Sequence, residues 1–181
     1  MLTGGRIVEC EAYGGVQDAA SHAFNRVKAR EQLGWQPGSA YIYLSYGIHT
    51  MMNIVAHEEG LTGGVLIRAI DPVEGIDIMR ERRLVDDARL TKGPGTLTIA
   101  MDIRLTDIGS RVNHDGLFSL YHADPHAPVQ SGTRIGISRA VDVPWRFFEH
   151  GNRNVSSHRR GSALTPEDLA ATIPPAGVTL H

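Results

Sequence analysis

The sequence predicts an α+β fold, a single domain of strands joined by short connections, with helices as insertions. Several short stretches alternate polar and apolar residues or are strongly apolar, as strands are. Short connections join most of them, and helical patterns interrupt the series instead of following every strand, which disfavours βαβ units. The 181 residues, 41% hydrophobic and 21% charged, fit one globular domain. We expect residues 1–165 to form this domain and residues 166–181 to form a C-terminal tail.

The first predicted strand is the stretch GRIVECEAY, residues 5–13. In strict alternation one face carries small apolar residues and is expected to face the core. This face consists of Val8, Cys10 and Ala12. The opposite face carries Glu9, Glu11 and Tyr13, together with Ile7.

A long polar segment, residues 14–38, follows the first strand. Loops of this length are usually functional or lack order. The apolar stretches at 41–45 and 48–55 predict a hairpin with a tight turn at Tyr46-Gly47, and residues 63–72 predict a third strand.

Helical patterns occupy the middle of the chain. Residues 73–90 predict a helix with Ile76, Met79 and Leu84 on its apolar face, and residues 93–103 predict a short helix with Pro94 in its first turn. Further strands are expected at 117–125, at 133–140 and within 144–156. A capped helical turn is expected at 165–172.

Charge and cysteine content limit the functional classes. The formal net charge is −2, so a nucleic-acid partner would need a local basic patch. Cys10 is the one cysteine, which excludes an intrachain disulfide and is typical of a small buried residue. The first residues, MLTGGR, do not resemble a signal peptide, and no apolar run reaches transmembrane length. We therefore expect a cytoplasmic protein.

Two carboxylates in the first strand are unusual, because strands disfavour glutamate. Glu9 and Glu11 lie two positions apart, which places their side chains on one face, roughly 6–7 Å apart. A solvated face would explain them, but Arg68 interrupts the apolar stretch GVLIRAI in a later strand. Arg68 either reaches solvent from an edge strand or pairs with a buried carboxylate. In the second case, a carboxylate and an arginine flanking one water would make a general-base site.

Aromatic residues gather at the predicted hairpin. Tyr41 and Tyr43 share a face and are typical of a core, whereas Tyr46 lies at the turn, where burial is difficult. An exposed aromatic residue at a hairpin tip can act as a wedge that fills space in a partner.

The histidines do not form a recognisable metal motif. His122 and His126 lie four apart in HADPH, but Pro125 breaks the helix that this spacing would need. The chain has no HExxH motif, no cysteine pair and no glycine-rich nucleotide-binding motif. We expect neither a metal nor a cofactor.

A series of motifs runs in order from Gly5 to about Ser156. They are RIVECEAY with His22 downstream, YIYLSYGIHTMMNIV, GGVLIRAIDPVEG, KGPGTL, and RIGI followed by PWRFF. Each is modest alone, but in this order and spacing the series resembles the alkyladenine (3-methyladenine) DNA glycosylase family. The resemblance implies a domain around a curved antiparallel sheet. It also implies an enzyme that flips an alkylated or deaminated purine out of duplex DNA and hydrolyses its N-glycosidic bond.

The resemblance assigns the hydrolytic roles. Glu11 corresponds to the general base that activates water, and Arg68 and the backbone carbonyl of Ile135 correspond to the groups that hold this water. No lysine nucleophile is implied, so we expect a monofunctional glycosylase. Glu9 has no corresponding role, and we expect it to lie in solvent and Glu9→Gln to have little effect.

The resemblance also assigns the base-binding residues. The walls that stack on the flipped base correspond to Tyr13, His22 and Tyr43. Tyr46 corresponds to the wedge that fills the gap in the duplex, and Asn53 to the residue that screens purines at the pocket floor. Electron-rich rings attract a cationic base by roughly 0.5–2 kcal/mol each, which favours alkylated purines.

DNA contacts must come from local basic residues, because the chain is mildly acidic. The candidates are Arg26, Lys28, Arg30, Lys92, Arg153, Arg159 and Arg160. Residues 25–36 depart from the family's Gly/Thr/Arg/Asn-rich pattern. The family also has a helix and a strand before the first strand found here, so we expect residues 5–13 to lack one strand partner. We expect a monomer that binds duplex DNA containing damaged purines.

Two alternatives belong to other functional classes. A lesion-binding DNA module would recognise damage without cutting, and would differ in the catalytic competence of Glu11. A small-molecule nucleoside or glycoside hydrolase would use the same carboxylate without the Tyr46 wedge, and would cleave free nucleosides.

Overall fold

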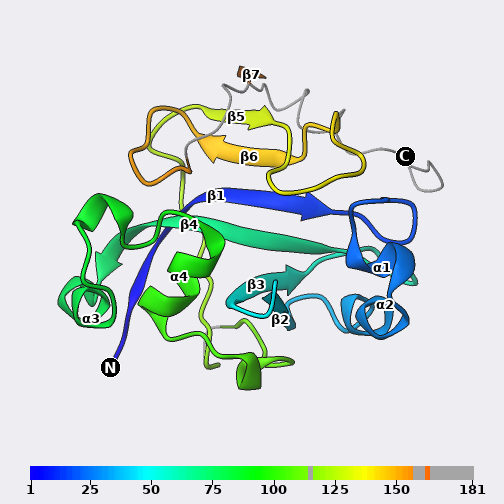
Figure 1. Ribbon diagram of the computed structural model, residues 1–181, viewed down its shortest axis with the longest axis horizontal. Coiled ribbons are helices and arrows are strands. Elements are labelled where there is room, and N and C mark those ends of the chain that lie inside the picture. The colour runs from blue at the N-terminus through cyan, green and yellow to red at the C-terminus, as the bar shows by residue number, and fades with distance from the viewer. Residues whose placement is uncertain (114–115, 157–161, 164–181) are drawn as a thin grey trace.

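One antiparallel sheet organises the fold (Figure 1). The computed structural model describes residues 1–113, 116–156 and 162–163, so the expected tail and the expected turn at 165–172 lie outside it. The strands are β1 (Gly4–Tyr13), β2 (Ala40–Ser45), β3 (His49–Val55), β4 (Gly64–Glu74), β5 (Val129–Gly132), β6 (Arg146–Glu149) and β7 (Ser162–Ala163). Their order across the sheet is β2-β3-β4-β1-β6-β5-β7. The predicted α+β class is confirmed.

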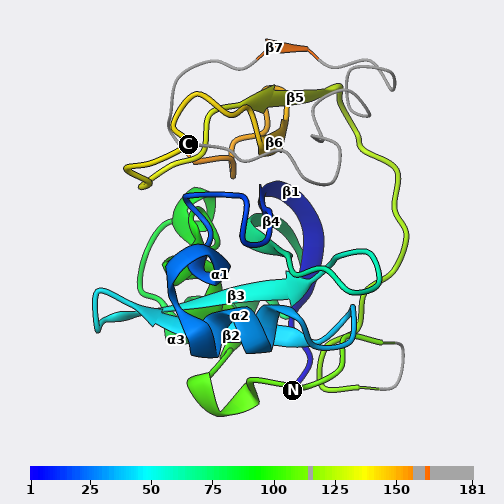
Figure 2. The same ribbon diagram turned by 90° about the vertical axis from the view of Figure 1, so that its right-hand side faces the viewer.

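Short helices flank this sheet. They are α1 (His22–Asn25), α2 (Val27–Leu33), α3 (Ile76–Arg82), α4 (Pro94–Met101) and the 3₁₀ turns η1 (Asp87–Arg89) and η2 (Leu105–Asp107). In Figure 2, α1 and α2 lie beside the β2–β3 hairpin, where Ala23, Ala29 and Leu33 pack with Tyr41 and Val55. Part of the segment 14–38 is therefore helical, because its few apolar residues pack against the core.

The β2–β3 hairpin forms as predicted. The turn uses left-handed backbone at Tyr46 (φ 51°) and Gly47 (φ 72°), which a tight turn requires. Alternation along β2 then sends Tyr41 to the α1–α2 side and Ile42 to a second cluster with Met52.

A third cluster joins β4 to α3 and α4, through Ile67, Ile70, Met79 and Leu97. Helix α4 begins at Pro94, as predicted, because the first helical residue needs no N–H donor.

The helix predicted at 73–90 is shorter than expected. It spans only α3, because Arg83 adopts an extended conformation (φ −141°, ψ 105°) and ends it. Leu84 was expected on the apolar face, but it is 94% exposed, and Val85 packs on the core instead.

Two predicted strands are wrong. Residues 117–125 form no strand: Leu117 and Leu120 are exposed, and Phe118 packs on the core from an irregular segment. Residues 133–140 form a loop, and the strand lies just before them as β5. The backbone N–H of Ile135 bonds to a side chain and not to a strand partner, and Gly136 has φ +77°.

Strand β1 lies inside the sheet and not at an unpaired edge. It pairs with β4 along its length and with β6 at Glu9, Cys10 and Glu11. The expectation that this strand would lack a partner is therefore wrong for that central stretch. In the described part of the chain, no helix is long and apolar enough to cross a membrane.

Candidate active site

The Glu9–Glu11 face of β1 is buried. Glu9 is 1% exposed and Glu11 is 0% exposed, whereas Cys10 on the opposite face is half-buried. The expectation of a solvated Glu9 is therefore wrong. The reason is tertiary: the loop after β5 and the segment after β6 cover this face and supply its polar partners.

A break in the β1–β4 register brings Arg68 to both carboxylates. Glu9 pairs with Ala69 and Cys10 pairs with Ile67, which leaves Arg68 as an extra residue in β4. Bulges of this kind redirect a side chain. Arg68 Nε donates to Glu9 Oε1 at 2.9 Å, and Arg68 Nη1 lies 3.3 Å from Glu11 Oε1. The paired interpretation of Arg68 is confirmed.

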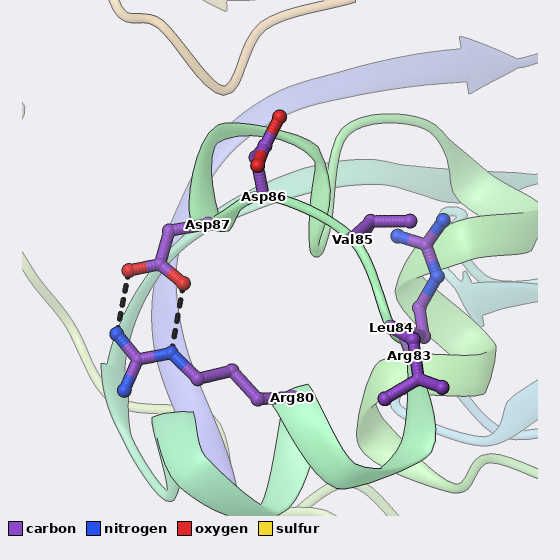
Figure 3. A pocket seen from close by; sticks show the side chains of 6 residues that line it. All are labelled: Arg80, Arg83, Leu84, Val85, Asp86 and Asp87. Atoms are coloured by element: carbon purple, nitrogen blue, oxygen red, sulfur yellow. Dashed lines mark hydrogen bonds and ion pairs between the residues drawn. The ribbon is translucent and has the colours of Figure 1, made fainter.

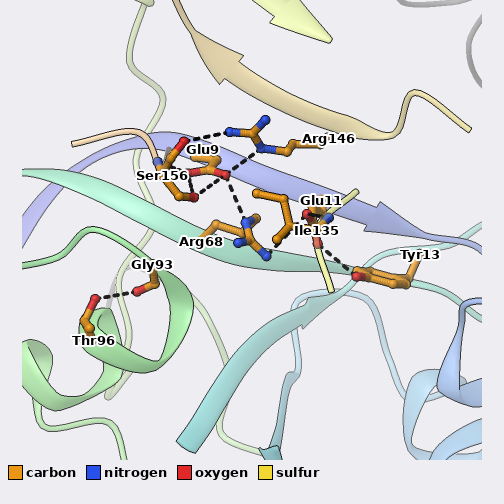
Figure 4. A network of polar contacts seen from close by, with 9 residues as sticks. All are labelled: Glu9, Glu11, Tyr13, Arg68, Gly93, Thr96, Ile135, Arg146 and Ser156. Atoms are coloured by element: carbon orange, nitrogen blue, oxygen red, sulfur yellow. Dashed lines mark hydrogen bonds and ion pairs between the residues drawn. The ribbon is translucent and has the colours of Figure 1, made fainter. Parts of the chain in front are cut away.

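Glu11 is held by donors from three segments (Figure 4). The backbone N–H of Ile135 donates to Oε1 at 2.7 Å, and the Tyr13 hydroxyl donates to Oε2 at 2.8 Å. A carboxylate has about four acceptor positions. With Arg68 near Oε1, at least one position remains for a further donor such as water.

Glu9 has its own set of donors. Arg146 Nε donates to Oε1 at 2.7 Å, and the Ser156 N–H donates to Oε2 at 2.7 Å, with the Ser156 hydroxyl alongside. Burial by itself would raise the pKa of Glu9, but the Ser156 hydrogen bonds and the charge of Arg68 outweigh it and lower that pKa. The two buried carboxylates thus face two buried guanidinium groups.

Aromatic side chains adjoin this network. The His22 and Tyr43 rings meet edge-on with centroids 4.5 Å apart, and His22 Nδ1 lies 2.9 Å from the Tyr41 hydroxyl. Burial, followed by the nearby charge of Arg26, lowers the pKa of His22 to about 4, so its ring is neutral at pH 7. Burial and then the charge of Glu11 raise the pKa of Tyr13 far above its usual range, which keeps its hydroxyl protonated as a donor.

A buried ion pair supports these rings. Arg134 Nη2 donates to Asp18 Oδ1 at 2.9 Å, and the Arg134 guanidinium lies 4.7 Å from the Tyr13 ring centroid. Asp18 also accepts the N–H groups of Gly14 and Ala20, both at 3.0 Å, in the loop that leads to His22. One pair thereby connects the end of β1, the start of α1 and the loop that carries Ile135.

The other predicted residues lie around this centre. Asn53 is buried on β3, and its Nδ2 donates to the Tyr41 carbonyl at 3.2 Å. Tyr46 at the hairpin tip is 90% exposed.

The predicted basic residues are not equivalent. Arg26 and Lys28 are exposed, while Arg30 donates to two carbonyls at the end of α1. Lys92 Nζ donates to the Arg153 carbonyl at 3.0 Å. Arg159 and Arg160 lie outside the described residues.

Sequence reasoning missed Arg134, Arg146, Asp18 and Ser156. The arginines carry the same signal that identified Arg68, a charge within an apolar stretch (TRIGI and PWRFF). Asp18 and Ser156 lie in polar segments and carry no comparable signal.

A separate open hollow lies at the end of α3 (Figure 3). It is lined by Arg80, Arg83, Leu84, Val85, Asp86 and Asp87, none of which contributes to the carboxylate site. Within residues 1–113, 116–156 and 162–163, no group of three or more His, Cys, Asp or Glu residues is placed to hold a metal ion.

Comparison with known proteins identifies the family. The profile described as methylpurine-DNA glycosylase (MPG) matches residues 2–153, most of the chain. The chain belongs to the methylpurine-DNA glycosylase family. The residues of the carboxylate site lie within this match, apart from Ser156.

Individual bacterial relatives support the same family assignment. A protein of Nitrosospira multiformis is 48% identical over 146 residues, which cover 80% of this chain and 75% of the relative. A protein of Chlorobaculum tepidum is 43% identical over 164 residues, 88% of this chain and 78% of the relative. Both bear the name "Putative 3-methyladenine DNA glycosylase". The family predicted from the motifs is confirmed.

Proposed function

We propose that this chain is a monofunctional purine DNA glycosylase of base-excision repair. It flips an alkylated or deaminated purine out of duplex DNA and hydrolyses the N-glycosidic bond with a water activated by Glu11. The observation that carries the proposal is the Glu11 carboxylate, which is 0% exposed, lies beside Arg68, and retains an acceptor position. A buried carboxylate aligned by fixed donors is suited to hold and deprotonate one water.

Hydrolysis at this site would pass through an oxocarbenium-like state of the sugar. Glu11 accepts a proton from the water, and the water oxygen forms a bond to the anomeric carbon. The glycosidic bond breaks, and its electron pair leaves with the purine. A 3- or 7-methylpurine already carries positive charge and leaves as a neutral base, whereas a neutral lesion such as hypoxanthine or ethenoadenine takes up a proton from solvent as it leaves. Arg68 and the backbone carbonyl of Ile135 hold the water, and the Glu11 charge stabilises the sugar cation.

Base binding would use the adjoining aromatic side chains. The His22 and Tyr43 rings are in edge contact with centroids 4.5 Å apart, which is too close for a base between them. Arg134 covers one face of Tyr13. In this proposal the flipped purine stacks between the other face of Tyr13 and the His22–Tyr43 pair, with Asn53 at the pocket floor.

DNA binding would use the surface around this pocket. Tyr46 fills the space that the flipped nucleotide leaves, and Arg26, Lys28 and Lys92 contact phosphates. The lysines of the chain are Lys28 and Lys92, and neither makes a contact with Glu11. We therefore assign no lysine a Schiff-base role. We further propose that the protein acts as a monomer in the cytoplasm.

Excision from defined duplexes tests the proposal. Oligonucleotides carrying hypoxanthine, 3-methyladenine, 7-methylguanine or ethenoadenine are incubated one at a time with wild type, Glu11→Gln and Glu149→Gln. Glu11→Gln keeps the shape of the side chain but removes its basicity, so excision should fall by ~10²–10⁴. Glu149 is a buried glutamate paired with Arg6, outside the site, and is the matched control.

The outcomes separate the functional classes. Full excision by Glu11→Gln would overturn the mechanism. A wild-type protein that binds lesions without cutting them would indicate a recognition module. Cleavage of free nucleosides without any cleavage of DNA would indicate a small-molecule hydrolase.

A further inference from the structure

Glu9 is the one carboxylate of the buried network that the mechanism above does not use. It lies two residues from Glu11 on the same face, and its side chain is fully buried. A buried charge is costly unless other interactions compensate it. Exposure to solvent therefore does not explain why a charged residue occupies this position.

We propose that Glu9 is a positioning residue for the hydrolytic reaction, acting through Arg68 to keep Glu11 competent as a base. The inference rests on the proposed function, because it assigns Glu9 a part in the same reaction. The observation that carries it is that one guanidinium group contacts both carboxylates, through Nε to Glu9 and through Nη1 to Glu11.

The planar guanidinium makes this geometry directional. Its donors form a rigid fork, so the direction of Nε also fixes the directions of the other two nitrogens. Glu9 accepts from Nε at 2.9 Å, and this leaves a single longer contact of 3.3 Å from Nη1 to Glu11. As the extra residue of the β4 bulge, Arg68 is not held by strand register alone.

Glu9 can impose this orientation because it is itself immobile. Arg146 from β6 and both donors of Ser156 hold its oxygens from the opposite side. Its lowered pKa, the net result of these bonds and the Arg68 charge against burial, keeps it ionised.

Loss of the Glu9 charge would release Arg68 toward Glu11. Arginine and carboxylate favour a bidentate pair, in which two N–H groups occupy both oxygens. Glu11 already accepts from Ile135 and Tyr13, so such a pair would use the remaining acceptor position. Without competition from Glu9, this second contact would compete with the water for Glu11, and the water would be held less well.

The charged and titratable groups around the two carboxylates come from several elements. Arg68 from β4 faces both of them. Arg146 faces Glu9, and Tyr13 and Tyr43 lie beside Glu11. Replacing Glu9 by Gln therefore changes the local balance by one negative charge.

Single-turnover excision of hypoxanthine from duplex DNA, measured over a pH series and a range of enzyme concentrations, tests the inference. For Glu9→Gln we expect the maximal rate to fall at least tenfold, towards the ~10²-fold that a small misplacement can cost. The half-saturating enzyme concentration should stay unchanged, because the base-stacking residues are intact. The acid limb of the rate profile should move to lower pH, which a purely structural role would not cause.

Glu149→Gln is the matched control, since Glu149 is a buried glutamate that pairs with Arg6 and does not contact Arg68. It should lose stability and keep the wild-type rate and pH profile. If Glu9→Gln does not fold, Glu9→Asp tests the same contact. This variant keeps the charge but shortens the side chain by one methylene, which should break the hydrogen bond from Arg68 Nε. It should also lose maximal rate.

Several results would overturn the inference. One is a folded Glu9→Gln with the rate and pH profile of Glu149→Gln. Where Glu9→Gln does not fold, a folded Glu9→Asp with the wild-type rate is another. A wild-type protein that excises no lesion would overturn the proposed function, and the inference with it. Normal wild-type excision together with normal Glu9→Gln excision would overturn the inference alone.

Discussion

The buried Asp18–Arg134 pair offers the clearest test of how this site is held together. Both side chains are almost inaccessible, at 1% and 0% exposure. Asp18→Asn keeps the size of the side chain and part of its accepting capacity for the Gly14 and Ala20 N–H groups. It removes the charge, so the Arg134 guanidinium would remain buried without a counter-ion.

The expected magnitude follows from this burial. Removing one partner of a buried ion pair costs about 3–5 kcal/mol of unfolding free energy. For a chain of this size, each kcal/mol lowers Tm by ~2–4 °C, so a fall of roughly 6–20 °C is expected. Excision should also decrease, because the pair positions Tyr13 and the loop that carries His22.

Urea unfolding and thermal melting of wild type and Asp18→Asn measure the effect. Asp87→Asn is the control, because Asp87 forms an ion pair with Arg80 on the surface, where exposed pairs contribute little. A double variant, Asp18→Asn with Arg134→Met, should regain part of the stability, since neither member of this pair is then left as a buried charge without a partner. If Asp18→Asn and Asp87→Asn unfold alike, the structural role assigned to the buried pair is wrong.

The remaining predictions concern the hairpin tip and acid stability. Tyr46→Ala should weaken binding to lesion-containing duplex by about 1–3 kcal/mol, the scale of base–aromatic stacking, and leave Tm unchanged. Leu84→Ala, an equally exposed truncation elsewhere, should change neither quantity, and a large fall in the Tm of Tyr46→Ala would show that Tyr46 is part of the core. The hydrogen bond from Arg6, with further donors, lowers the pKa of Glu149 from its ordinary 4.5 to about 2. The stability that Glu149 contributes is therefore present above pH 4.5 and lost as the pH falls towards 2. The difference in unfolding free energy between wild type and Glu149→Gln should shrink over this range, and a constant difference would contradict this account.

Local patterns in the sequence were sufficient for most of the sheet. Alternation predicted β1, apolar stretches predicted β2, β3 and β4, and the Tyr46-Gly47 turn predicted the β2–β3 hairpin. These features depend on neighbouring residues, which a single sequence displays directly. The prediction of strands at 117–125 and 133–140 was wrong, because the apolar residues there are either exposed or part of a loop.

The sequence also determined that Arg68 is exceptional. A charge in an apolar strand must reach either solvent or a partner, and Glu9 and Glu11 were candidate partners. The same reasoning applied to Arg134 and Arg146 would have identified two further buried cations.

Only the tertiary structure decided that the Glu9–Glu11 face is buried and which side chains complete it. Ile135 and Ser156 bond to these carboxylates across 124 and 147 positions of sequence. Strand periodicity states which residues share a face, but it carries no information about what covers that face. The β1–β4 register break, which lets one arginine contact both glutamates, likewise arises only when the two strands pair.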